Sequence, residues 1–336
     1  MNCVERLLRA LRFEETDRVP ATGLMTSVTV DLMELCGVSW PEAHFDSEKM
    51  ATLAAAAYEH YGLESLKLPF DMLVETEALG GKVDFGNLDT LPQARDHLYD
   101  DPADLASAVD RSLFAKARFP TVLSAIAIAK KRYGGIIPVV SSIVGPFTLG
   151  AKLFGFENFL TWMVLEPETL AYALESTTDL CAMYAKEQVA AGCDVVQIGE
   201  ASCSGDLISG ESYGRHIAPF HKELCAQISV PSVVHICGNI TGHLKYIADT
   251  GMSGISMDEK TDVNEAVRLL KGNTAVIGYV PTLEVLLNGT AREVTEKSLE
   301  CIKTGVNVLN AGCAWPARVS GENIVAMVLA ARNART

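Results

Sequence analysis

Three residues of this chain have side chains that bind transition metals, and their spacing places two of them together. His235 and Cys237 lie two residues apart in a β-branched run, Val-Val-His-Ile-Cys-Gly at 233–238. On a β-strand, residues two apart point to the same face, and the glycine and asparagine after the pair put it at the carboxyl end of the strand. Cys313 follows a second short apolar run, directly after Gly312. One imidazole and two thiolates suit Zn²⁺, and three protein ligands leave one coordination position open, as in catalytic zinc sites.

The same three residues have a simpler interpretation. Free cysteines are commonly buried as small hydrophobic residues, and a lone His-x-Cys is a weaker metal signature than close Cys-x-x-Cys pairs. Position favours the functional interpretation, because both segments are expected at strand ends of a barrel. That rim is where the catalytic residues of such barrels lie.

The order of the expected elements predicts this fold. From residue 105 onwards, strand-like apolar runs alternate with stretches of helical periodicity, which indicates βαβ units and a parallel sheet. Strands are expected near residues 19, 65, 136, 194, 232, 254, 275 and 306. Helices are expected at 4–11, 46–61, 105–118, 120–133, 157–191, 211–228, 240–249, 262–271, 291–304 and 320–333. This pattern favours a (β/α)₈ TIM barrel with an elaborated N-terminal helical region, as one domain over residues 1–336. A doubly wound open sheet would carry a glycine-rich turn after its first strand, and none is present.

Composition limits the classes of partner. The chain has 336 residues, is 49% hydrophobic and carries a net charge of −14, which argues against nucleic acid and anionic membrane surfaces as partners. Its apolar runs are too short to span a bilayer, and the first residues lack the apolar segment of a signal peptide. Nine cysteines are an odd number spread over the chain, which indicates reduced thiols. A cytoplasmic location is therefore expected.

Several segments resemble a known family. His-Ile-Cys-Gly-Asn-Ile-Thr at 235–241, together with Cys313 in Asn-Ala-Gly-Cys-Ala-Trp-Pro, resembles the methylcobalamin:coenzyme M methyltransferases of the uroporphyrinogen decarboxylase superfamily. The resemblance covers most of the chain, including Asp17-Arg-Val-Pro, Gly62-Leu-Glu-Ser and Ser204-Gly-Asp-Leu-Ile-Ser. It implies a barrel in which Zn²⁺, held by His235, Cys237 and Cys313, binds the thiol of the methyl acceptor. It also implies a methylated corrinoid as the donor and coenzyme M as the acceptor, with tetrahydrofolate as an alternative acceptor.

Two features refine what this resemblance implies. Uroporphyrinogen decarboxylases carry an arginine-bearing segment soon after Arg-Val-Pro, but residues 21–34 of this chain contain no arginine. A decarboxylase-like lyase that acts on a substrate with many carboxylates is therefore disfavoured. The chain also lacks an evident Asp-x-His-x-x-Gly cobalamin segment, so a separate corrinoid protein is the expected donor and a small thiol the expected substrate. A non-catalytic binding protein, with a closed shell of four ligands, is the third alternative.

Carboxylates at the expected strand ends are the remaining candidates. Glu200 and Asp258 are expected at the rim as catalytic residues, and Glu200 would either orient His235 or act as a fourth, displaceable ligand. The alternative for Glu200 is a solvated loop carboxylate. Glu75 and Glu77 either face the cavity or stabilise a helix N-terminus. Cys203 is expected on the same rim loop, but the resemblance gives it no ligand role, and the small residues there are interpreted as making room for substrate. Four histidines lack ligand spacing with the three residues and are interpreted as surface or packing residues, namely His44, His216, His221 and His243.

Overall fold

A ring of parallel strands forms the centre of the protein. The computed structural model describes residues 1–334. Within that range, the main sheet has seven strands in the order β1-β4-β5-β6-β7-β8-β9, and each neighbouring pair is parallel. The strands are β1 (Leu66–Leu68), β4 (Val139–Val144), β5 (Val195–Gly199), β6 (Ser232–Ile236), β7 (Gly254–Met257), β8 (Ala275–Val280) and β9 (Val308–Ala311).

The eighth position of the ring is occupied by a short extended segment. A single parallel bridge joins Ala21 to Leu309 on β9. The carbonyl of Ala21 accepts a hydrogen bond from the backbone N–H of Glu64, just before β1, at 2.9 Å. The segment therefore lies between the first and last strands and closes the barrel. The predicted strand at residue 19 is reduced to this bridge because Pro20 has no N–H to donate to a ladder. The predicted barrel fold is confirmed.

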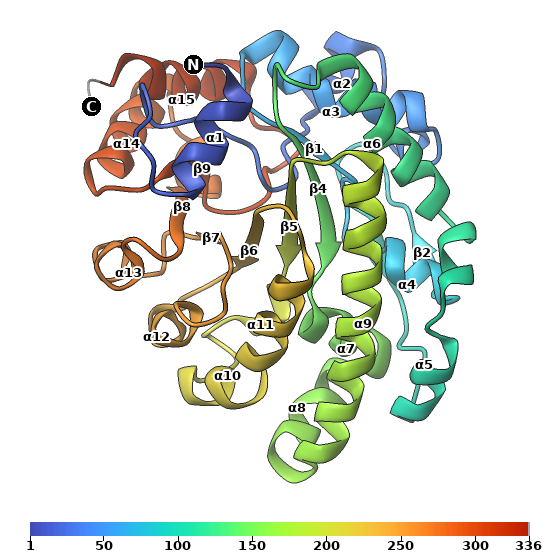
Figure 1. The fold of residues 1–336 in the computed structure, drawn as a ribbon. Coiled ribbons are helices and arrows are strands. Elements are labelled where there is room, and N and C mark those ends of the chain that lie inside the picture. The colour runs from blue at the N-terminus through green and yellow to red at the C-terminus, as the bar shows by residue number, and fades with distance from the viewer. Residues whose placement is uncertain (335–336) are drawn as a thin grey trace.

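Helices surround the sheet on the outside (Figure 1). Both termini lie at one end of the barrel, and α7, α8 and α10 lie at the other, beyond the carboxyl ends of the strands. The helices are α1 (Cys3–Leu11), α2 (Val30–Cys36), α3 (Ser47–Tyr61), α4 (Val74–Ala78), α5 (Pro102–Ala108), α6 (Phe119–Tyr133), α7 (Pro146–Phe154), α8 (Phe156–Leu165), α9 (Pro167–Ala191), α10 (Gly210–His216), α11 (Ala218–Gln227), α12 (Leu244–Ile247), α13 (Val263–Leu270), α14 (Ala291–Lys303) and α15 (Gly321–Asn333). A small antiparallel pair, β2 (Val83–Asp84) and β3 (Gln93–Ala94), lies in the connection between α4 and α5.

Some predicted helical stretches are divided, including 211–228, which forms α10 and α11, and a proline or a polar cap explains two of the divisions. The helical segments predicted at 157–191 are α8 and α9, which separate before Pro167 because the residue before a proline avoids helical geometry. The predicted helix at 105–118 is wrong beyond Ala108. There the Asp110 side chain accepts from the N–H of Ser112 and begins a separate 3₁₀ turn, Arg111–Ala115. Helices α2, α4 and α7 were not predicted. The first two offer few turns, and α7 is buried on nearly every side and so lacks the polar face that gives a helical periodicity.

The barrel interior has an apolar layer below a polar one. Strand register directs the apolar layer inward, where its side chains form one buried cluster that includes Val140, Val195, Val233, Ile277 and Val308. Some residues pair with inward-facing side chains on a neighbouring strand, and others lie two positions further along the same strand, so all of them point to the same side. They form what we call the upper polar layer: Lys67, Ser142, Gln197, His235, Ser256 and Asn310. All six are buried. The carboxyl end of the barrel is therefore chemically distinct from its packed base. No helix in the described part of the chain is both long and apolar enough to cross a membrane.

Candidate active site

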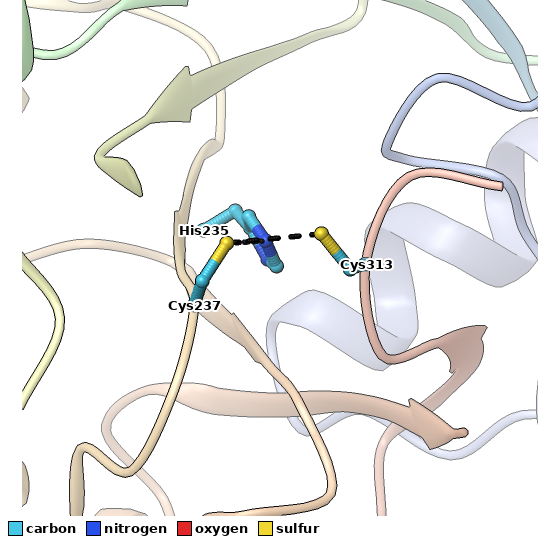
Figure 2. Close-up of side chains that lie close together, drawn as sticks. All are labelled: His235, Cys237 and Cys313. Carbon is cyan, nitrogen blue, oxygen red and sulfur yellow. Dashed lines mark hydrogen bonds between the residues drawn. The ribbon is translucent and has the colours of Figure 1, made fainter. Parts of the chain in front are cut away.

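The three ligand-type residues of the sequence converge at the carboxyl end of the barrel (Figure 2). His235 is on β6, Cys237 directly follows that strand, and Cys313 lies two residues beyond β9. The Nε2 atom of His235 is 3.2 Å from Sγ of Cys237, and the two cysteine sulfurs are 3.7 Å apart. One ligand atom from each residue lies within 4.8 Å of the other two. The structure thus brings together residues that are 76 positions apart in the chain.

Asp258 and Gly238 fix the turn that carries Cys237. Gly238 has φ +76°, a left-handed conformation that glycine adopts without strain. Its N–H donates to Oδ2 of Asp258 at 2.5 Å. A Cβ at this position would lie 2.2 Å from Oγ of Ser204, so a side chain is excluded there. Asp258, a predicted catalytic residue, therefore lies beside the three residues and holds the backbone next to Cys237.

Ser256 positions the imidazole ring. It pairs in register with His235 across β6 and β7, and its Oγ lies 3.1 Å from Nδ1 of the ring. When Nδ1 carries the proton and donates it to this hydroxyl, the lone pair of Nε2 points towards Cys237. Ser256 could not be identified from the sequence, because its separation of 21 residues from His235 indicates a contact only once the strand register is known.

The two thiols influence each other's ionisation. The hydrogen bond that Cys237 donates to Cys313 raises the pKa of Cys237 far above its usual value, and burial acts in the same direction. The same hydrogen bond, helped by His235, lowers the pKa of Cys313. One sulfur of the pair is therefore readily available as a thiolate, the form of cysteine that binds metals.

Glu200 does not make the contacts expected of it. Its side chain is fully buried, and its oxygens accept from the N–H groups of Phe147 (3.1 Å) and Thr148 (2.8 Å) at the start of α7. Within residues 1–334, the histidine that it contacts is His221, 2.8 Å away, and Ser256 rather than Glu200 partners the ring of His235. The expected orienting or ligand role of Glu200 is corrected accordingly. Its carboxyl group satisfies free amides at a helix N-terminus, where backbone N–H groups lack partners within the helix.

A buried hydrogen-bonded group surrounds Glu200. Its carboxyl oxygen lies 3.6 Å from Sγ of Cys203, and these two residues with His221 form a second close set of ligand-type side chains. The other ring nitrogen of His221 lies 2.9 Å from the hydroxyl of Tyr213. His243 contacts the carbonyl of Cys203 at 3.1 Å. His221 and His243 are buried, as a packing role requires, but their hydrogen bonds were not predicted from the sequence.

A second buried network lies beyond β1. Arg118 is 2% exposed and donates two hydrogen bonds to Asp71 (2.7 and 3.1 Å) and one to Glu77 (2.5 Å). Glu75 is buried and accepts from the N–H of Val144 at 2.8 Å. Burial raises the pKa of Glu75 to about 7. Arg118 was not identified from the sequence, and its charge is already matched by two carboxyl groups.

Comparisons with known proteins agree with this geometry. The uroporphyrinogen decarboxylase (URO-D) family model matches residues 3–334. The chain is 35% identical over 335 residues to the methylcobamide:CoM methyltransferase of Methanosarcina acetivorans, covering 98% of this chain and 97% of the relative. It is 33% identical over 332 residues to a methylated-thiol–coenzyme M methyltransferase of Methanosarcina mazei, covering 99% and 89%.

A solved structure extends the likeness to three dimensions. A methyltransferase from Methanosarcina mazei superposes with a TM-score of 0.94 at 32% identity, covering 99% of this chain and 98% of that one. The resemblance inferred from the sequence motifs is confirmed. The chain belongs to the uroporphyrinogen decarboxylase family, is related within it to the methylcobamide:CoM methyltransferases, and is itself a methyltransferase.

Proposed function

We propose that this enzyme transfers a methyl group from a methylated corrinoid to the thiol of coenzyme M, with Zn²⁺ as its metal. His235, Cys237 and Cys313 would hold the ion. The convergence of these three residues is the observation that carries the proposal, because they are the borderline and soft ligands that zinc prefers. The activities for which the relatives are named support the donor and the acceptor.

The distances fit a tetrahedral ion. Two sulfurs at about 2.3 Å from a tetrahedral zinc lie about 3.8 Å apart, and the two thiols are separated by 3.7 Å. A nitrogen and a sulfur on the same ion lie about 3.5 Å apart, against 3.2 Å between His235 and Cys237. Small side-chain rotations therefore suffice to bind the ion. Three protein ligands leave one position for a substrate thiol.

The surrounding residues prepare this position. A free thiol, with a pKa of about 8.5, is mostly protonated near neutral pH. Bound zinc would supply the positive charge that favours its thiolate form. Two thiolate ligands balance the charge of the ion, so an added thiolate keeps its electron density and its nucleophilicity. Ser256 holds the ring of His235, and Asp258 holds the turn of Cys237. These hydrogen bonds keep the ligands in place while substrate enters and leaves.

The same proposal defines the partners. A separate corrinoid protein presents the methyl group, and a small thiol accepts it, in a cytoplasmic reaction without nucleic acid or membrane. The net charge of −14 disfavours binding to nucleic acid and to anionic membranes. Residues 1–336 act as one barrel domain, supported by a family match over residues 3–334.

Metal analysis combined with a transfer assay tests the proposal. Purified enzyme is expected to bind one zinc ion and to methylate coenzyme M with free methylcobalamin as the donor. Cys237→Ser and Cys313→Ser are expected to lose both zinc and transfer. Cys36→Ser, at a thiol away from the site, is the matched control and should retain both. Wild-type protein that stays metal-free after incubation with zinc would overturn the proposal.

A further inference from the structure

Lys67 is a buried cation inside the barrel. Its register with Val140, a member of the interior apolar cluster, directs the side chain inward from β1. The residue is 4% exposed, and its Nζ donates to the carbonyl of Pro69 at 2.6 Å. A lysine ammonium has three donors, and this is the one hydrogen bond it makes among residues 1–334. No carboxylate within that range forms an ion pair with it.

The nearest acidic groups are already engaged. Asp71 is bound by Arg118, and the oxygen of Glu75 accepts from the N–H of Val144. Burial lowers the pKa of Lys67 to about 8, although the charges of Asp71 and Glu75 act in the opposite direction. The ammonium group therefore remains mostly cationic at neutral pH. A buried charge without a paired counterion is costly to a fold. The position is therefore suited to an anion that arrives from outside the chain.

The Lys67 ammonium reaches the carboxyl end of β1, where the carbonyl of Pro69 accepts its hydrogen bond, and so faces the same end of the barrel as the cysteine–histidine site. The carbonyl of Pro69 that Lys67 contacts is also within 3.5 Å of Oγ of Ser142 in the upper polar layer. Met72, three residues after Pro69, packs against Gly199. A Cβ added to Gly199 would lie 2.5 Å from the terminal carbon of Met72. Gly199 pairs in register with His235. The carboxyl end of β1 and the site on β6 therefore face one shared space at the mouth of the barrel.

Gln197 adds neutral donors to this space. It points inward from β5, two residues before Gly199, and is 4% exposed. Its side chain makes no hydrogen bond within the described residues, and its amide nitrogen would lie 3.7 Å from a Cβ at Gly199. Buried amides are normally paired. A cation and a free amide in one layer are the donors that a sulfonate or carboxylate group requires.

We propose that Lys67 binds the anionic end of the methyl acceptor and makes the enzyme selective for short acidic thiols. This inference rests on the proposed function, since the thiol end of the same molecule is the one that zinc would bind. In coenzyme M a two-carbon chain separates the thiol from the sulfonate, so both ends fit within one barrel mouth. Gln197 supplies a second hydrogen bond to the anion.

Paired substrates test the role of Lys67. Lys67→Met and wild-type enzyme, both loaded with zinc, are assayed with free methylcobalamin and either 2-mercaptoethanesulfonate or 2-mercaptoethanol. The variant is expected to show a KM at least about tenfold higher for the sulfonate, as for a lost charge-assisted hydrogen bond. Its KM for the neutral thiol should change less than about twofold on the same reasoning. Lys67→Arg should restore part of the selectivity, and Lys271→Met, an exposed lysine, should behave as wild type.

A second measurement is independent of the metal and of transfer. Ethanesulfonate, which has no thiol, is expected to bind wild-type protein in calorimetry with or without zinc and to lose binding in Lys67→Met. Equal effects of Lys67→Met on both thiols would overturn the inference, as would unchanged binding of ethanesulfonate. If Lys67→Met does not fold, wild-type enzyme with equal KM values for the two thiols would also overturn it. Failure of zinc-loaded wild type to methylate any thiol would instead overturn the proposed function.

Discussion

Ser256 and His235 face each other across two parallel strands, with Oγ of the serine 3.1 Å from Nδ1 of the ring. The opposite nitrogen, Nε2, lies 3.2 Å from Sγ of Cys237. A single hydroxyl therefore determines which ring nitrogen is directed at the cysteines. This arrangement matters because a metal requires the unprotonated nitrogen of a neutral imidazole.

We expect Ser256→Ala to weaken zinc binding by about 10- to 100-fold, the usual cost of losing a hydrogen-bond partner of a metal-binding histidine. The fold should persist, since the substitution leaves a methyl group in a buried position. Competition with a chromophoric chelator measures the affinity. Ser253→Ala, just before the same strand, removes a hydroxyl remote from the ring and is the control. Equal zinc affinity in Ser256→Ala and wild type would contradict the expected role.

The separation of the two sulfurs gives a prediction for the metal-free protein. Cys237 and Cys313 lie 3.7 Å apart, so small movements bring them to bonding distance. Treatment with hydrogen peroxide should join them, with loss of two hydrogens from the thiols and reduction of the peroxide to water. Peptide mapping by mass spectrometry should find this cross-link and no other among the nine cysteines. Bound zinc should slow the reaction, and a cross-link at any other pair would contradict the proposed pairing.

Glu75 gives the protein a measurable pH dependence of stability. Burial raises its pKa from an ordinary 4.5 to about 7. The folded state therefore holds a proton that the unfolded state releases, and stability falls as the pH rises from 4.5 to about 7. The loss in the free energy of unfolding is absent below this pH window and complete above it, where it amounts to at most about 3 kcal/mol.

Glu75→Gln removes this dependence, because the amide oxygen still accepts from the N–H of Val144 but no longer titrates. We expect the variant to gain stability relative to wild type as the pH rises from 5 to 8. Urea unfolding at several pH values in this interval measures the difference. Glu223→Gln, at an exposed position on α11, is the control. A difference between variant and wild type that is constant with pH would exclude the titration of Glu75 as the cause.

The parts of the site that the sequence could predict are those set by local geometry. Residues 235 and 237 share a face because strands alternate, and Cys313 follows a strand end, so all three belong to the same rim. Partners across strands could not be predicted in this way. Ser256 and Lys67 acquire their positions from strand register, and the connecting helices of a parallel barrel vary too much in length to fix it.

The same limit explains the errors in the fold and the rim. Pro20 interrupts a ladder that the surrounding apolar residues favour, so the eighth strand shrinks to one bridge. Glu200 is correctly placed after β5, but its partners come from α7, a helix the sequence analysis did not find, and from His221. Long-range pairs such as these carry no spacing signal in a single sequence.

Glu200 provides the sharpest distinction between a structural and a metal-binding carboxyl group. Glu200→Gln places an amide NH₂ where the N–H groups of Phe147 and Thr148 require acceptors. At least one buried donor is then left unpaired, so the free energy of unfolding should fall by about 1–3 kcal/mol. The zinc content should remain unchanged, because the contacts of His235 lie on Ser256 and Cys237. Denaturant unfolding and metal analysis of the same samples measure both quantities, with the exposed Glu211→Gln as control. Loss of zinc at an unchanged free energy of unfolding would return Glu200 to the ligand set. A purely structural carboxyl group could not lower the zinc content without also lowering stability, whereas a ligand of the ion could.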